Sequence, residues 1–192
     1  MATFLIFHHA QGRTTGMDSF AELLRDAGHD VHAPDYYSGH TFTDLASGLE
    51  FADRMGFDTV IDHGTRAAMG LPAHTIYIRF SLGVLPAQKL AQIRPGAAGA
   101  ILVGSCLPLG EFAGTWPRGV PAQIHAMDAD PVFVDEGDLD AARDLVRHSL
   151  DAELFLYRGA SHLFTDSSLP SYDHAAAQSF TTRVLGFLDA LQ

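Results

Sequence analysis

The chain has 192 residues, of which 47% are hydrophobic and 18% are charged, and its formal net charge is −11. These values exclude a disordered chain and predict one ordered globular domain over residues 1–192. The negative charge and the lack of a Lys- or Arg-rich run argue against nucleic acid as a partner. No apolar run approaches the ~18 residues that a membrane helix requires, so no membrane partner is expected.

The cysteine and histidine content gives no sign of a metal site. Cys106 is the single cysteine, which excludes a disulfide within the chain. The histidines include no H-x-x-x-H pair, and no C-x-x-C spacing is present. Because the first residues lead into an apolar segment without a basic region or a cleavage site, we expect a cytoplasmic protein.

Short apolar segments alternate with segments of helical periodicity along the chain. In chain order, we expect a strand at 4–7, a helix at 18–27, a strand at 29–33, helices at 45–55 and 58–69, a strand at 76–78, a helix at 85–93, strands at 97–103 and 120–125, a helix at 139–149, a strand at 153–157 and a final helix at 180–191. This alternation predicts an α/β fold with a mostly parallel sheet of about six strands and helices on both faces.

The segment from Thr75 to Gln92 joins a short apolar strand to an amphipathic helix through Phe80-Ser81-Leu82-Gly83. A serine at a sharp strand-to-helix turn, with glycine two residues later, is the second half of the G-x-S-x-G nucleophile elbow. Arg79 occupies the position of the first glycine. Ser81 is therefore the candidate nucleophile, and Arg79 is a departure from the pattern.

Two further polar residues, Asp130 and His162, each follow a predicted strand. Ligands of parallel α/β sheets bind beyond the carboxyl ends of the strands, so we expect these residues to meet Ser81 there. The chain order Ser…Asp…His is that of the α/β-hydrolases. His162 would remove the proton of the Ser81 hydroxyl during attack, and Asp130 would orient the imidazole and stabilise its charged form.

The negative charge that develops on an attacked carbonyl oxygen needs fixed hydrogen-bond donors. We expect one donor to be the backbone N–H of Leu82, which follows the nucleophile at the start of a helix. The second donor is expected from the loop after the first strand, at Ala10.

Cys106 competes with Ser81 for the role of nucleophile, because it also follows a predicted strand. However, Leu107-Pro108 interrupts the helix that a nucleophile needs behind it, and no glycine stands two residues on. A buried, inert thiol is therefore the favoured interpretation of Cys106.

Asp128 competes with Asp130 for the role of the orienting carboxylate. The Asp-Pro pair formed by Asp130 and Pro131 favours Asp130, which leaves Asp128 as a loop or capping residue. We expect Asp166, further along the chain, at the surface or at a helix cap.

Four segments match motifs of one known family. The most specific is Tyr157 to Phe164, which fits the histidine segment Y-x-G-A-x-H-x-F. The other three fit an oxyanion loop, a nucleophile elbow and an aspartate segment, at residues 7–12, 80–83 and 125–131. With these segments the chain resembles, over essentially its whole length, the dienelactone hydrolase family of small α/β-hydrolases. The resemblance implies the α/β-hydrolase fold.

Three positions depart from the family's pattern. The best-known member has a cysteine nucleophile where this chain has Ser81, as many relatives do. That member also has a glutamate in the oxyanion loop where this chain has His9, so its resting-state switch is not expected here. Arg79 would either crowd the neighbouring strand or reach the cleft as a cation for a substrate carboxylate, and a salt-bridged or exposed arginine is the alternative. We name His9, Arg79 and Tyr36 as candidate substrate-binding residues.

The residues and the resemblance together predict a serine hydrolase without a cofactor, which cleaves small esters or lactones through an acyl-enzyme. The short chain leaves little room for a separate lid, so we expect an open cleft, a small-molecule substrate, and a monomer or homodimer. One alternative is a catalytically impaired relative that binds small molecules or acts as a scaffold. Another is a flavodoxin-like binding domain, although residues 8–16 resemble a phosphate loop only weakly.

Overall fold

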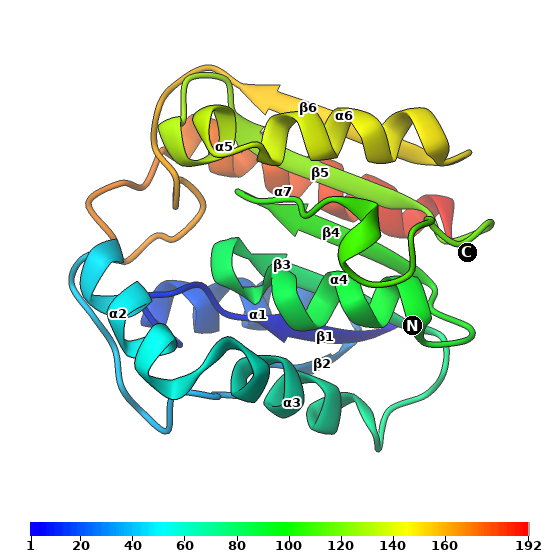
Figure 1. The fold of residues 1–192 in the computed structure, drawn as a ribbon, viewed down its shortest axis with the longest axis horizontal. Helices are drawn as coiled ribbons and strands as arrows, with labels where there is room; N and C mark the ends of the chain where they lie inside the picture. Colours follow the sequence, from blue (N-terminus) through cyan, green and yellow to red (C-terminus); the bar gives the residue numbers. More distant parts are fainter. Residues whose placement is uncertain (192) are drawn as a thin grey trace.

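The computed structural model describes residues 1–191, apart from the side chains of Val84 and Asp189. Its strands form one sheet in the order β2-β1-β3-β4-β5-β6, and each neighbouring pair is parallel (Figure 1). The strands are β1 (Thr3–Phe7), β2 (Asp30–His32), β3 (Thr75–Phe80), β4 (Gly99–Val103), β5 (Ala122–Met127) and β6 (Ala152–Tyr157). Within the described residues this is the six-stranded α/β architecture that the sequence predicts.

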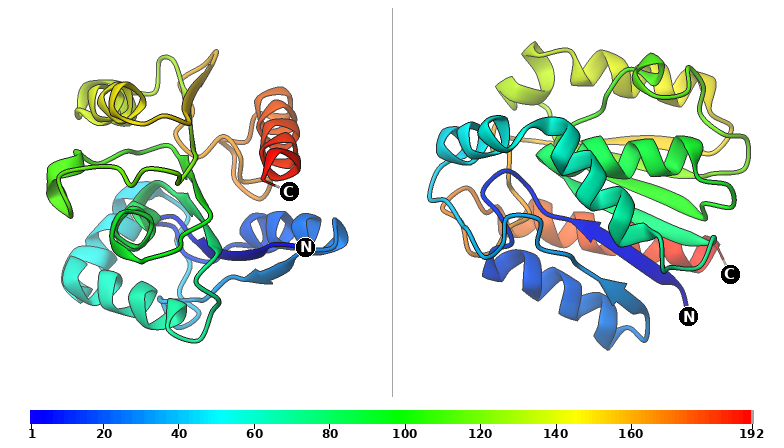
Figure 2. Two further views of the ribbon diagram at one scale, coloured as in Figure 1. Left: turned by 90° about the vertical axis from the view of Figure 1, so that its right-hand side faces the viewer. Right: turned by 60° about the horizontal axis from the view of Figure 1, so that its bottom comes forward.

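Helices cover both faces of the sheet, as the left view of Figure 2 shows. One face carries α1 (Thr15–Asp26) and α7 (His174–Ala190). The other face carries α2 (Leu45–Met55), α3 (Phe57–Ala68), α4 (Val84–Ile93), α5 (Pro131–Asp135) and α6 (Asp138–His148). Single 3-10 turns occur at η1 (Ser81–Gly83) and η2 (Leu109–Glu111).

The alternation of side chains along β3 assigns its residues to two separate cores. Ile76, Ile78 and Phe80 belong to the core beneath α1 and α7. Tyr77 belongs to the core beneath the helices of the other face. Arg79 lies two residues after Tyr77 and therefore projects from the same face of the sheet as Tyr77.

The predicted boundaries differ from the structure where pairing or capping extends an element. Strand β3 is longer than the predicted apolar run, because β1 and β4 pair with it on both sides as far as Arg79 and Phe80. Helix α5 was not expected from the sequence. It forms because Asp130 caps it through the Val132 N–H and proline occupies its first turn.

None of the described helices combines the length and the hydropathy that a membrane-spanning segment requires.

Gly83 allows α4 to begin directly against the end of β1. A Cβ at this position would lie 2.8 Å from the Phe7 Cβ and 2.9 Å from the Phe7 carbonyl oxygen. Both distances are shorter than a carbon contact allows, so only glycine permits this approach. The turn that carries Ser81 is thereby packed onto the neighbouring strand.

We expect Gly83→Ala to lower the free energy of unfolding by about 1 to 3 kcal/mol, because the added methyl group must displace α4 from β1. The matched control is Gly186→Ala in α7, where an added Cβ has no neighbour within 4 Å among the described residues beyond the adjoining stretch of its own helix. There we expect a gain of up to about 1 kcal/mol from helix propensity. Urea denaturation measures both values, and equal stability of Gly83→Ala and the wild type would contradict the packing argument.

Candidate active site

The backbone at Ser81 adopts an unusual conformation. Its φ is 47°, in the left-handed region, and among the described residues other than glycine only Ser38 shares a positive φ. Non-glycine residues adopt this region at a cost in free energy, and they do so mainly where the surrounding structure enforces it. Here the paired end of β3 lies on one side of Ser81 and the start of α4 on the other. The serine is held at a fixed, sharp turn.

Two short hydrogen bonds link Ser81, His162 and Asp130. The Ser81 Oγ lies 2.7 Å from His162 Nε2, and His162 Nδ1 lies 2.7 Å from Asp130 Oδ2. An ionised carboxylate only accepts, so Nδ1–H donates to Asp130, and Nε2 then accepts from the serine hydroxyl. The structure therefore brings the three predicted residues together, from the ends of β3, β5 and β6.

Asp130 uses its two oxygens for different tasks. Oδ2 contacts His162, while Oδ1 accepts the Val132 N–H at 3.1 Å and caps α5. The Asp130 carboxyl is buried, and its hydrogen bond to the N-terminus of α5 fixes its position. Asp128 instead accepts the Gly159 N–H at 2.9 Å and is exposed. Of the two aspartates, the structure brings Asp130 to the histidine.

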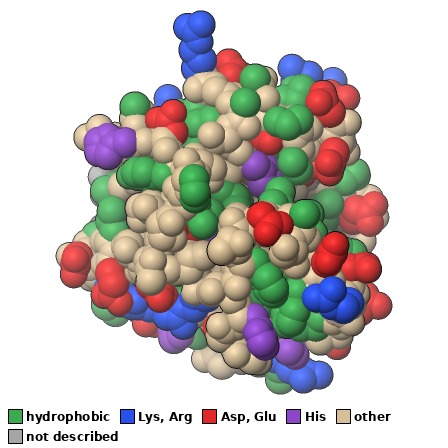
Figure 3. Space-filling model, turned by 90° about the vertical axis from the view of Figure 1, so that its left-hand side faces the viewer, with side chains coloured by type: hydrophobic (Ala, Val, Ile, Leu, Met, Phe, Trp, Pro, Cys, Tyr) green, Lys and Arg blue, Asp and Glu red, His purple; other side chains and the backbone are tan. Residues whose placement is uncertain are grey.

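A cavity of about 260 Å³ opens beside Ser81 and His162. Its apolar walls come from α2, α3, η1, α4, α5 and the loop after β4, and they comprise Leu45, Leu49, Phe57, Leu82, Leu85, Leu107 and Val132. Ser105, Glu136 and Asp138 are its other polar lining residues. Figure 3 views the molecule from the side at which the strands end, where hydrophobic side chains lie among acidic and histidine side chains.

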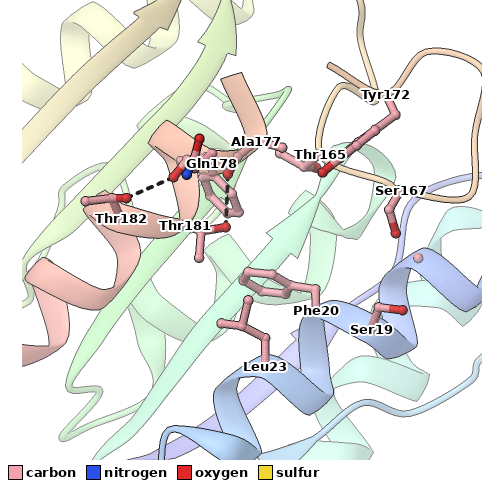
Figure 4. A pocket seen from close by; sticks show the side chains of 12 residues that line it. Ser19, Phe20, Leu23, Thr165, Ser167, Tyr172, Ala177, Gln178, Thr181 and Thr182 are labelled. Atoms are coloured by element: carbon pink, nitrogen blue, oxygen red, sulfur yellow. Dashed lines mark hydrogen bonds between the residues drawn. The ribbon is translucent and has the colours of Figure 1, made fainter. Parts of the chain in front are cut away.

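A second cavity, of about 290 Å³, lies between α1 and α7 (Figure 4). Phe20 and Leu23 enter it from α1, and Thr181 and Thr182 from α7. Its described lining contains hydroxyl and amide groups but no histidine, carboxylate or cation. Because the cavity between α1 and α7 has no histidine or carboxylate that could act as a base beside a nucleophile, the cavity at Ser81 is the candidate active site.

The residues predicted as oxyanion donors lie at the same edge of the sheet. Leu82 follows Ser81 and lines the cavity. Ala10 is buried in the loop after β1, where α2 packs closely against it: a Cβ on Gly48 would lie 2.1 Å from the Ala10 carbonyl oxygen. Their role as donors stays a prediction.

The structure does not bring the three predicted substrate-binding side chains into the described lining of this cavity. Tyr36 is buried, stacks on the His8 ring and donates its hydroxyl to the His8 carbonyl. His9 is buried, and its Nε2 forms a hydrogen bond with Asp166. Arg79 is fully buried and donates from Nη1 to the Ser81 carbonyl at 3.0 Å. Each is held by an internal hydrogen bond rather than directed at the cavity.

Asp166 lies at the centre of a buried hydrogen-bond network, so the prediction of a surface or capping position was wrong. His9 Nε2 lies 2.8 Å from Asp166 Oδ2, and the Thr14 hydroxyl donates to the same oxygen. The other oxygen accepts from the Ser168 N–H at 2.8 Å and from its hydroxyl at 2.6 Å. His9 Nδ1 accepts the Gln11 N–H, which identifies Nε2 as the donor to Asp166. The network joins the loop of Ala10, the start of α1 and the loop after His162.

Burial by itself would raise the pKa of Asp166. The hydrogen bonds from His9, Ser168 and Thr14 favour the ionised form, outweigh the effect of burial and hold the pKa at about 2. No local pattern of the sequence indicates this role, because Asp166 and His9 are 157 positions apart.

Cys106 is buried and has the properties of an inert thiol. Burial raises the pKa of its thiol to about 12, so almost no thiolate exists near neutral pH. Its backbone N–H donates to Asp138 at 2.6 Å. Among the side chains that the structure describes, no group of three or more His, Cys, Asp or Glu is arranged to hold a metal ion.

The sheet order and the two helical layers are those of the α/β-hydrolase fold. The model of the dienelactone hydrolase family matches residues 97–192, which is half of the chain. The chain belongs to the dienelactone hydrolase family. This chain is accordingly an ester hydrolase, since the lactones after which the family is named are cyclic esters.

Solved structures share the fold at low sequence identity. A dienelactone hydrolase-like promiscuous phosphotriesterase from metagenomic libraries is 20% identical, with a TM-score of 0.76 over 100% of this chain and 87% of that one. A butyrate-bound thermophilic esterase of Thermogutta terrifontis is 18% identical, with a TM-score of 0.63 over 99% of this chain and 83% of that one. A comparison with curated protein sequences finds no match.

We expect Asp166→Asn to lower the free energy of unfolding at pH 7 by roughly 1 to 3 kcal/mol, since a buried carboxylate with several donors is lost. A folded-state pKa near 2 lies below the unfolded value of about 4. The contribution of Asp166 is therefore complete above pH ~5 and is lost as the pH falls from about 4 toward 2. Urea denaturation of both proteins from pH 7 to pH 3 measures the difference. A difference that is constant down to pH 3 would contradict the assignment.

Proposed function

We propose that this chain is a serine hydrolase that cleaves small carboxylic esters or lactones through an acyl-enzyme on Ser81. The observation that carries the proposal is the pair of 2.7 Å hydrogen bonds from Ser81 to His162 and from His162 to Asp130. A serine hydroxyl is a weak nucleophile unless a base lies within hydrogen-bond reach, and His162 Nε2 lies within that reach.

In the first half of the reaction, Ser81 Oγ attacks the carbonyl carbon and its proton passes to His162 Nε2. The carbonyl electron pair moves to the oxygen, and the resulting tetrahedral oxyanion expels the leaving oxygen, which takes the proton from His162. An ester releases an alcohol, and a lactone opens to a hydroxyacyl chain on Ser81. Water then attacks the acyl group by the same proton transfers, which releases the carboxylic acid and restores the serine. This chemistry requires no cofactor.

The backbone N–H groups of Leu82 and Ala10 are the donors that we assign to the oxyanion. Leu82 supports this assignment because it lies in the cavity wall directly after Ser81, in the turn η1 that leads into α4, and the helix dipole favours negative charge at that end. Ala10 lies in the loop after β1, the strand adjacent to β3.

The dimensions and the walls of the cavity support a small substrate with an apolar acyl group. A volume of about 260 Å³ with seven apolar lining residues fits a short acyl chain. The butyrate bound to the Thermogutta terrifontis esterase is a ligand of this size on the same fold. A single domain over residues 1–192, a cytoplasmic location, and a monomeric or homodimeric state stay predictions.

Hydrolysis of p-nitrophenyl acetate by matched variants tests the proposal. We expect Ser81→Ala to lower kcat by about 10³-fold or more, and Asp130→Asn by about 10²- to 10⁴-fold. Asp128→Asn is the control, because it makes the same chemical change two residues away and does not contact His162. It should retain kcat within about 2-fold.

Two results would oppose the proposal. Full turnover by Ser81→Ala would exclude Ser81 as the nucleophile. No turnover by the wild type with any short-chain ester or lactone would favour the impaired relative that binds small molecules instead.

A further inference from the structure

Arg79 is a fully buried cation directly beneath the turn that carries Ser81. Its Nη1 donates to the Ser81 carbonyl, while Nε and Nη2 have no hydrogen-bond partner among the described residues. No carboxylate of the described residues forms a salt bridge with it. Burial of a cation and of unpaired N–H groups costs free energy, so the stability of the fold does not explain this residue.

Arg79 remains a cation near neutral pH despite this burial. Burial lowers the pKa of its guanidinium to about 9, against the opposing effects of Cys106 and Asp138 nearby. The Ser81 carbonyl therefore accepts a charge-assisted hydrogen bond, which is stronger than a bond from a neutral donor.

The Ser81 carbonyl and the Leu82 N–H belong to the same peptide group. The C–N bond of a peptide is conjugated, so a positive charge at the oxygen withdraws electron density from the nitrogen and makes its N–H a better donor. Hydrogen bonds in such a chain strengthen one another. The bond from Arg79 also fixes the plane of this peptide, and thus the direction of the N–H, next to the strained φ of Ser81.

We infer that Arg79 is a positioning residue of the oxyanion hole, which orients and polarises the Ser81–Leu82 peptide so that the Leu82 N–H stabilises the oxyanion. The inference rests on the proposed function, because it needs a tetrahedral oxyanion at Ser81. This role explains why an arginine, Arg79, can occupy the position at which the elbow pattern has glycine.

The surroundings of the cavity argue against the other role considered for Arg79, the binding of a substrate carboxylate. Arg79 is fully buried and is not among the residues that line the cavity. The charged lining residues are Glu136 and Asp138, which would repel an anion. Arg79 lies behind the cavity wall and donates a hydrogen bond to the protein backbone, which fits a role within the protein rather than in substrate binding.

The variants Arg79→Lys, Arg79→Gln and Arg79→Met test the inference with p-nitrophenyl acetate. We expect kcat to fall about 10- to 100-fold in Arg79→Met while KM changes by less than about 2-fold, because the interaction acts on the transition state. Arg79→Lys retains the charge and should retain more kcat than Arg79→Gln. These two variants keep a polar side chain and preserve the test if Arg79→Met does not fold.

The selectivity for an ester over its thiono ester separates this role from a merely structural one. Sulfur accepts hydrogen bonds weakly, so a strong oxyanion hole favours the oxygen ester. We expect the ratio of kcat/KM for the two substrates to fall in Arg79→Gln and Arg79→Met. Arg94→Met is the control, since Arg94 also donates to a backbone carbonyl, that of Leu71, but lies at the other end of α4. It should retain the ratio.

An unchanged kcat in all three Arg79 variants would overturn the inference. A lower kcat with an unchanged ester-to-thiono-ester ratio would also overturn it, because Arg79 would then only hold the elbow in shape. In either case the wild type still hydrolyses the ester and Ser81→Ala does not. Failure of the proposed function would appear differently, as no turnover by the wild type or as full turnover by Ser81→Ala.

Discussion

The positive φ at Ser81 is the constraint on which the rest of the site depends. A residue with a side chain occupies this conformation only if its neighbours enforce it. The parallel pairing of β3 fixes one side of the turn, and the close approach of Gly83 to Phe7 fixes the other. The hydrogen bond from Arg79 holds the carbonyl between them. The Ser81 hydroxyl is therefore presented in a fixed position at the edge of the sheet.

The loops that meet Ser81 are ordered by contacts of their own. Asp130 caps α5 with the oxygen that does not contact His162, so its orientation does not depend on the histidine. Asp166 ties the loop after His162 to His9, which directly precedes Ala10, and to Thr14, which is the N-cap of α1. These two carboxylates fix the geometry of a proposed general base and a proposed oxyanion loop before any substrate arrives.

Local patterns in the sequence were sufficient to predict the architecture and the three residues that meet at the carboxyl edge of the sheet. Apolar runs predicted the strands, and the elbow with the order Ser81, Asp130, His162 predicted which side chains would meet, since parallel strands end at one edge. Side-chain direction was not predictable in the same way. The pattern could not show that the Arg79 guanidinium donates to the Ser81 carbonyl, or that His9 and Tyr36 form hydrogen bonds within the protein interior. The position of Asp166 was predicted wrongly because two of its partners, His9 and Thr14, lie more than a hundred positions away.

Labelling of the wild-type protein with a fluorophosphonate, followed by peptide mass spectrometry, tests most directly the claim that the turn after β3 presents an activated nucleophile. The account predicts a single modified peptide, with the label on Ser81. The rate of labelling should parallel the hydrolysis of p-nitrophenyl acetate. No labelling would contradict the account, and so would a label on another serine of the cavity, such as Ser105.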